Sequence, residues 1–127
     1  MERKTAVRAS VAVVVLASAL AASAAAQTRS TQKLVGATGK NEAFKITLTN
    51  ASGKLVKTLK AGTYTFVIHD YSAGHNYELD GPHGKSWTFT TVPFIGVKKF
   101  TITLKVGKYK AYCKVHESFM FQHFTVT

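Results

Sequence analysis

Polar and apolar residues alternate along several short stretches of the chain. These stretches span residues 44–48, 63–68, 99–105 and 123–127. Their apolar positions hold Phe, Tyr, Ile, Leu and Val, and a period of two with such residues is typical of strands with one buried face. Turn-forming residues stand between the stretches, at positions 50–53, 60–62, 80–82 and 106–107. The pattern predicts an all-β fold, either a sandwich or a barrel.

Alternation also divides the aromatic and histidine residues between core and surface. The side chains expected in the core are Phe44, Ile46, Leu48, Tyr64, Phe66, Ile68, Trp87, Phe89, Phe100, Ile102, Leu104, Phe124 and Val126. His69 and His123 alternate with core positions, so we expect both to face solvent, and His83 falls in a turn.

Residues 105–108 are predicted to form a tight hairpin turn. In a hairpin, the start of the first strand lies beside the end of the second. The loop before the first strand, which holds Phe94 and Ile95, is therefore expected at the same end of the fold as Cys113. Alternation along the second strand directs Cys113 to the interior and Tyr112 to the outside.

The N-terminal segment has the organisation of a secretory signal peptide. Three basic residues precede an uncharged run over residues 11–26 that is rich in Ala and Val and ends in three alanines. The run is shorter than the ~20 residues of a membrane-spanning helix. We expect cleavage after Ala26, a flexible leader over residues 27–33 and one domain over residues 34–127. The location is then extracytoplasmic, periplasmic or secreted, with no membrane span.

Composition narrows the possible partners and sites. The single cysteine excludes an internal disulfide and any zinc site built on cysteine pairs. A net charge of +11 raises the question of nucleic acid. After Ala26, however, Arg29 is the one arginine beside thirteen scattered lysines, whereas nucleic-acid surfaces favour clustered arginine. We therefore expect no nucleic-acid partner.

The candidate chemistry lies near the C-terminus. Cys113, His116 and Met120 place a thiolate, an imidazole and a thioether on one short segment, and this combination suits copper. A trigonal site needs a second histidine. His75, expected at the start of a strand, is the best of the remaining four.

These motifs resemble those of the cupredoxins, the small type 1 (blue) copper proteins such as plastocyanin, azurin and amicyanin. The resemblance rests on the pattern C-x2-H-x3-M after a strand, with Gly74-His75-Asn76 upstream, and it covers residues 34–127. It implies a Greek-key β-sandwich, one copper ion cycling between Cu(I) and Cu(II), and single-electron transfer in place of enzymatic turnover.

The resemblance also implies roles for six residues. The implied ligands are His75, Cys113 and His116 in the equatorial plane and Met120 in the axial position. Asn76 is expected to brace the ligand loop through hydrogen bonds, and Gly74 matches the residue whose carbonyl faces the metal in azurins. The spacing from Cys113 to His116 is plastocyanin-like and that from His116 to Met120 is azurin-like. Glu117 therefore stays an alternative axial ligand, although turning it inward would bury a charge.

The resemblance further implies that electrons enter through His116. An apolar collar is expected around it, formed by Val115, Phe119, Phe121, Phe94 and Ile95. The basic surface suggests an acidic redox protein as partner, steered by lysines 99, 105, 108 and 110, unless these lysines only confer solubility. We expect a monomer. Two alternatives stay open: a copper carrier or store without a redox partner, and a domain that kept the fold with an altered or lost metal site.

Overall fold

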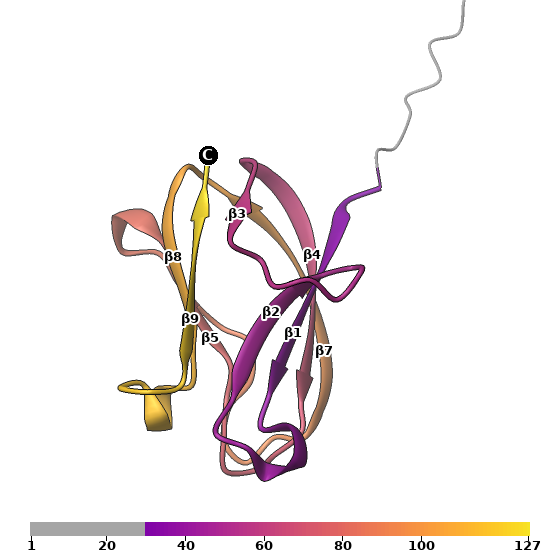
Figure 1. Ribbon diagram of the computed structural model, residues 1–127, viewed down its shortest axis with the longest axis vertical. Coiled ribbons are helices and arrows are strands. Elements are labelled where there is room, and N and C mark those ends of the chain that lie inside the picture. The colour runs from indigo at the N-terminus through magenta and orange to yellow at the C-terminus, as the bar shows by residue number, and fades with distance from the viewer. Residues whose placement is uncertain (1–29) are drawn as a thin grey trace, which may run out of the picture.

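The computed structural model describes residues 30–127, in which nine strands form two sheets that pack face to face (Figure 1). The strands are β1 (Gln32–Thr38), β2 (Ile46–Asn50), β3 (Thr58–Leu59), β4 (Gly62–Asp70), β5 (Glu78–Asp80), β6 (Ser86–Thr88), β7 (Gly96–Leu104), β8 (Gly107–Tyr112) and β9 (Phe121–Val126). Three single-turn 3₁₀ helices connect them: η1 (Lys40–Glu42), η2 (Pro82–Gly84) and η3 (Lys114–His116). The expected signal peptide, residues 1–26, lies outside the described residues. Within residues 30–127, no helix is long and apolar enough to cross a membrane.

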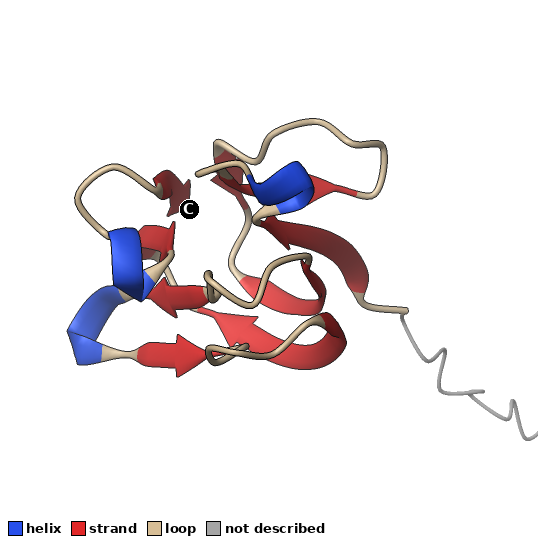
Figure 2. Cartoon of the chain, turned by 90° about the horizontal axis from the view of Figure 1, so that it is seen from below, coloured by secondary structure: helices blue, strands red, loops and turns tan. Residues whose placement is uncertain are grey.

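The strand order is that of a sandwich with crossovers. One sheet has the order β2-β1-β4-β7 and the other the order β3-β9-β8-β5-β6. The pairs β1–β4 and β3–β9 are parallel, and the remaining pairs are antiparallel. Figure 2 shows the helical turns as short segments between strands. The predicted all-β Greek-key sandwich is confirmed.

The core lies between the sheets and follows the predicted alternation. In β4, the side chains of Tyr64, Phe66 and Ile68 are at most 5% exposed. Phe89 is also buried, and its ring stacks on that of Phe66 at 5.4 Å between centroids. Trp87, in contrast, is only half-buried at the margin of this core.

Strand β1 begins at Gln32, inside the leader expected over residues 27–33. Gln32 and Lys33 are already in parallel register with Tyr64 and Thr65 of β4. The central position of β1 between β2 and β4 supplies backbone partners that a polar sequence alone does not reveal.

Phe44 is not part of the core, contrary to the prediction from alternation. Strand β2 begins only at Ile46, because the backbone N–H of Gly39 donates to the carbonyl of Lys45 (3.1 Å) and closes a loop before the strand. The Phe44 side chain is 61% exposed on this loop.

The predicted hairpin at residues 105–108 is wrong. Strands β7 and β8 belong to different sheets, so the turn carries the chain across the sandwich. The hydroxyl of Tyr109 donates to the carbonyl of Lys105 (2.9 Å) and accepts from its N–H (3.0 Å), replacing the ladder bonds of a hairpin. The two strands still run in opposite directions. The start of β7, paired with the end of β4, thus lies at the same end of the sandwich as Cys113.

Candidate metal centre

Three of the predicted ligands meet at one end of the sandwich. Cys113 directly follows β8, and His116 ends the helix η3 that comes next. His75 comes from the connection between β4 and β5. It was expected to begin a strand, but β5 starts only at Glu78. The backbone N–H of His75 instead donates to the carbonyl of Ser72 (3.2 Å) in a turn.

The donor atoms form a compact triangle. The Nδ1 atoms of His75 and His116 are 3.1 Å apart, and the Sγ of Cys113 lies 3.8 Å and 3.7 Å from them. The point equidistant from these three atoms is about 2.1 Å from each, within the ~2.0–2.3 Å of metal–nitrogen and metal–sulfur bonds. The triangle therefore has the size for one metal ion.

The environment of His75 favours a neutral imidazole. His75 is 4% exposed and His116 is half-buried. Burial, and then the neighbouring His116, lower the pKa of His75. A neutral ring offers a lone pair to a metal, which a protonated ring does not.

Asn76 makes hydrogen bonds to Cys113 and to the residue that follows it. The thiol is fully buried, and the backbone N–H of Asn76 donates to its Sγ (3.4 Å). The side-chain Oδ1 of Asn76 accepts from the backbone N–H of Lys114 (2.8 Å), directly after the cysteine. The hydroxyl of Thr38 donates to the Asn76 carbonyl (3.3 Å). These bonds tie the His75 loop to the Cys113 loop.

Gly74 lies in the turn directly before His75, where its N–H donates to the Oγ of Ser72 (3.2 Å). On the opposite side of that turn, Gly39 has φ +67° and packs against the ligand. A Cβ at Gly39 would lie 2.6 Å from the Ser72 Cβ and 2.8 Å from the His75 Cδ2. Only glycine therefore fits between η1 and the imidazole of His75.

The segment from Cys113 to Met120 is closed by its own backbone. The N–H of Cys113 donates to the Met120 carbonyl (3.1 Å), and the N–H of Met120 donates to the His116 carbonyl (2.9 Å). Met120 is 1% exposed. The Glu117 side chain, in contrast, is half exposed and forms an ion pair with Lys110 (3.0 Å). Burial of the thioether and this outward ion pair favour Met120 as the axial donor.

Exposed aromatic rings cover the histidines. The Phe44 ring meets His75 and His116 edge-on, at 5.3 Å and 5.0 Å between centroids, and Phe119 lies 5.5 Å from His116. Phe119 and Val115 are each 59% exposed. Of the expected collar, Phe121 is 43% exposed and Ile95 60% exposed, whereas Phe94 is half-buried with Lys98 over its ring.

Sequence reasoning missed several contributors to this end. Phe44 and Gly39 are brought to His75 by the loop before β2. Tyr112, assigned to the outer face, is 7% exposed because its hydroxyl hydrogen-bonds the buried Glu78. Burial, and then Glu78, raise the pKa of Tyr112, which keeps its hydroxyl protonated. Two signals were available in the sequence: Phe44 is the first residue of an alternating run, and Glu78 and Asp80 place two carboxylates in one strand.

The lysines divide between the two ends. Lys105 and Lys108, expected to steer a partner, flank the turn at the end opposite the metal centre, and Lys110 is paired with Glu117. The lysines adjacent in sequence to residues of the centre are Lys40, Lys45 and Lys114, all exposed.

His69, His83 and His123 do not take part in the cluster formed by His75, Cys113 and His116. His123 is exposed as predicted, and His83, expected in a turn, lies in η2 and is also exposed. His69 is only half-exposed, because its ring stacks on Tyr71 at 5.9 Å.

Comparison with known proteins supports the architecture. No protein-family model and no curated protein matches the chain. A solved structure of the copper protein rusticyanin aligns with a TM-score of 0.55 at 18% identity, covering 75% of this chain and 76% of that chain. Reduced rusticyanin aligns with a TM-score of 0.55 at 18% identity, over 75% and 78% of the two chains. Rusticyanin from Thiobacillus ferrooxidans gives a TM-score of 0.52 at 19% identity, over 75% and 76%.

The chain has the cupredoxin fold. Within this cupredoxin sandwich, two imidazoles and a cysteine sulfur converge at hydrogen-bonded loops, with a buried thioether on the same segment. This donor set fits a single type 1 copper ion, because soft sulfur suits Cu(I) and imidazole suits both oxidation states.

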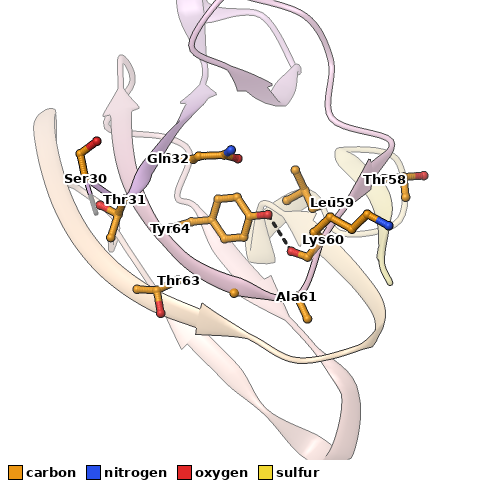
Figure 3. A pocket seen from close by; sticks show the side chains of 10 residues that line it. Ser30, Thr31, Gln32, Thr58, Leu59, Lys60, Ala61, Thr63 and Tyr64 are labelled. Atoms are coloured by element: carbon orange, nitrogen blue, oxygen red, sulfur yellow. Dashed lines mark hydrogen bonds between the residues drawn. The ribbon is translucent and has the colours of Figure 1, made fainter. Parts of the chain in front are cut away.

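The other end of the cupredoxin sandwich is hollowed instead. A hollow of about 750 Å³ lies where β3, β4 and the start of β1 meet (Figure 3). The Tyr64 ring points into it, and the Tyr64 hydroxyl donates to the Lys60 carbonyl (2.6 Å). No His, Cys, Asp or Glu residue lines this hollow, and the one group of three metal-binding donors found within residues 30–127 is that of His75, Cys113 and His116 at the opposite end.

Proposed function

We propose that this protein is an exported blue copper protein that carries single electrons between redox partners. The observation that carries the proposal is the donor triangle of His75, Cys113 and His116, whose centre lies about 2.1 Å from each donor atom. His75, Cys113 and His116 are the equatorial ligands in this proposal, and Met120 is the axial one. Bound copper supplies the one-electron Cu(I)/Cu(II) couple.

Rigidity of the donors supports electron transfer. The Cys113 loop is closed by backbone hydrogen bonds, the His75 ring is packed against Gly39, and Asn76 links the two loops. Donors held in this way keep nearly the same arrangement in both oxidation states, so little has to reorganise when an electron arrives or leaves. Burial of the Cys113 sulfur also protects it from water and oxidants.

The surface over His116 is suited to a brief encounter with another protein. Phe44, Val115 and Phe119 are each about 60% exposed there. Single exposed apolar residues are common, but three around one half-buried imidazole form a desolvating contact surface. We assign the electron path to the His116 ring, which lies directly beneath Phe44 and Phe119.

The charge around this surface indicates an acidic partner. Three exposed lysines lie there: Lys40 is the first residue of η1, and Lys45 and Lys114 directly follow Phe44 and Cys113. A basic rim around an apolar centre speeds the encounter with an acidic surface and allows quick release. Export through the N-terminal signal peptide then places both partners outside the cytoplasm, and the protein acts as a monomer.

Stopped-flow mixing of the reduced, copper-loaded protein with an oxidised acidic cytochrome tests this function. We expect cytochrome reduction together with formation of a blue Cu(II) protein that keeps its metal. Release of copper to a metal-free acceptor protein, with the cytochrome left oxidised, would instead identify a copper carrier.

A further inference from the structure

Glu78 is a buried carboxylate beside the metal centre that has no cation partner. Its side chain is 7% exposed, and the one ion pair among residues 30–127 joins Lys110 to Glu117. Burying a carboxylate without a cation costs free energy, because its hydration is lost and only neutral donors replace it. Stability alone therefore does not account for a glutamate at this position.

Both oxygens of Glu78 accept hydrogen bonds from groups next to the ligands. The side-chain Nδ2 of Asn76 donates to Oε1 (3.1 Å), and the hydroxyl of Tyr112 donates to Oε2 (3.0 Å). Asn76 directly follows His75, and Tyr112 directly precedes Cys113. Glu78 and Tyr112 are also Cα partners in the β5–β8 register. One carboxylate thus joins the His75 loop to the Cys113 strand.

The carboxylate also fixes the orientation of the Asn76 amide. In the observed orientation, Nδ2 faces Glu78 and Oδ1 faces the backbone N–H of Lys114. A flipped amide would set oxygen against carboxylate and N–H against N–H, so both contacts would become repulsive. Because the Glu78 oxygen that faces Asn76 accepts a hydrogen bond, it permits just one of the two orientations of the amide.

We propose that Glu78 is a positioning residue for the metal centre, acting through Asn76 on the Cys113 loop and through Tyr112 on the Cys113 strand. The part that concerns copper rests on the proposed function. The part that concerns the Asn76 amide is a property of the metal-free protein.

The test compares three variants. Glu78→Leu removes both hydrogen bonds that the carboxylate accepts and fills the same space with an apolar side chain of similar volume. Glu78→Gln keeps a carbonyl oxygen for Asn76 and rescues the arrangement, since the Tyr112 hydroxyl is also able to accept from the new amide. Asp80→Leu is the matched control, because Asp80 shares Tyr112 (3.2 Å) and binds Ser86 (2.7 Å) but has no hydrogen bond to Asn76.

Hydrogen exchange at the Lys114 backbone amide is the readout without copper. We expect exchange at least ~10-fold faster in Glu78→Leu than in wild type, and unchanged in Glu78→Gln and Asp80→Leu, since only the first frees Asn76. Unchanged Lys114 exchange in a folded Glu78→Leu protein overturns the proposal. If that variant does not fold, the Asn76 side-chain amide of the wild type decides: slow exchange supports the proposal, and exchange as fast as an exposed amide refutes it.

Copper binding is the second readout. We expect copper affinity to fall roughly 10- to 100-fold in Glu78→Leu, with a shifted thiolate-to-copper absorption band. In an Asn76→Ala background the same change should have little further effect on the band, because the intermediary is gone. Full additivity of the two substitutions contradicts action through Asn76. If Lys114 exchange is faster in Glu78→Leu but the wild-type protein takes up no copper, the proposed function is wrong and the positioning of Asn76 by Glu78 still holds.

Discussion

The two ends of the sandwich share their strands but differ in almost every surface property. At the end where β4 and β8 terminate, two buried donors and one half-buried donor lie beneath exposed aromatic rings, and hydrogen bonds link one loop to the next. The end where β7 passes into β8 also holds the start of β4, where a hollow has Lys60 and Tyr64 as its ionisable side chains. Tyr109 and Tyr64 hydrogen-bond only backbone groups there.

The difference shows that the loops at one end of the sandwich supply the metal-binding side chains. Strands fix the positions at which loops begin, and loops supply the side chains that react or bind. The connection after β4 and the one after β8 carry all three donors of the triangle, whereas the turns at the other end only reverse or transfer the chain. Substitutions matched in type but placed at opposite ends should therefore differ in their effect on copper and agree in their effect on the backbone.

The largest difference is expected between Gly39→Ala and Gly53→Ala. Both glycines have positive φ, +67° and +84°, so each alanine costs about 1–2 kcal/mol of backbone strain. At Gly39 the new Cβ also collides with Ser72 and His75, whereas at Gly53 it meets open space. Copper affinity should fall roughly 10-fold or more in Gly39→Ala, because the His75 ring has to move and a ligand held in the wrong orientation binds the metal more weakly. Copper titration with calorimetry checks this, and equal affinities of the two variants would contradict the contact with His75.

Charge neutralisation compares the two ends next. One triple variant changes Lys40, Lys45 and Lys114 to Gln. Its reduction by an acidic cytochrome should be about 10-fold slower than that of wild type at low salt, because electrostatic steering is lost. The same change at Lys60, Lys105 and Lys108 is the control at the far end. Both triple variants lose equal net charge, so equal rates would remove the basis for docking at the metal end.

Raising the salt concentration sharpens this comparison. The difference between the two triple variants should fade as ionic strength passes ~0.15 M, where the screening length is ~8 Å. A difference that persists in high salt would point to lost packing in place of lost steering.

The sequence predicted the strands of this molecule better than its connections. Alternation places Tyr64, Phe66 and Ile68 correctly because each strand has one buried face. It cannot show that β7 and β8 lie in different sheets, since the Tyr109 hydroxyl that replaces the hairpin bonds is defined only by the folded turn.

The same limit applies at the metal centre. Cys113 and His116 could be predicted from their spacing within one short segment, and His75 from the separate motif Gly74-His75-Asn76. Phe44, Gly39 and Glu78 reach the centre through tertiary contacts, and the alternation of apolar and polar residues does not show which elements they will contact.

The axial position gives a smaller and more local effect. Met120→Leu should remain blue and gain reduction potential, because loss of the axial donor withdraws electron density from the copper and this destabilises Cu(II) more than Cu(I). Glu117→Gln should leave colour and potential nearly unchanged, since the carboxylate faces Lys110 and solvent. Cyclic voltammetry and visible spectra measure both. A green or red protein that turns blue on Glu117→Gln would make Glu117 the ligand.

The smallest effect concerns Asp70, which is buried close to the metal end. Burial raises the pKa of Asp70, so the folded state holds this proton at pH values where the unfolded chain has lost it. Stability of the metal-free protein should therefore fall as pH rises from about 4 through the raised pKa of Asp70. Asp70→Asn should remove this pH dependence, so the stability of the variant relative to wild type should increase as the pH rises. Urea denaturation at several pH values checks this, with Glu117→Gln as the exposed control. If the difference in unfolding free energy between Asp70→Asn and wild type does not vary with pH, the pKa of Asp70 is not raised by burial.

Addition of Cu(II) to the purified wild-type protein and to Cys113→Ser tests the central claim most directly. The wild type should turn intensely blue at one copper per chain, because that colour arises from a copper–thiolate bond. Cys113→Ser should stay folded, since the sandwich core buries most of the apolar surface, and should show no blue band. A colourless wild type, or a blue Cys113→Ser protein, would contradict the assignment of the metal centre.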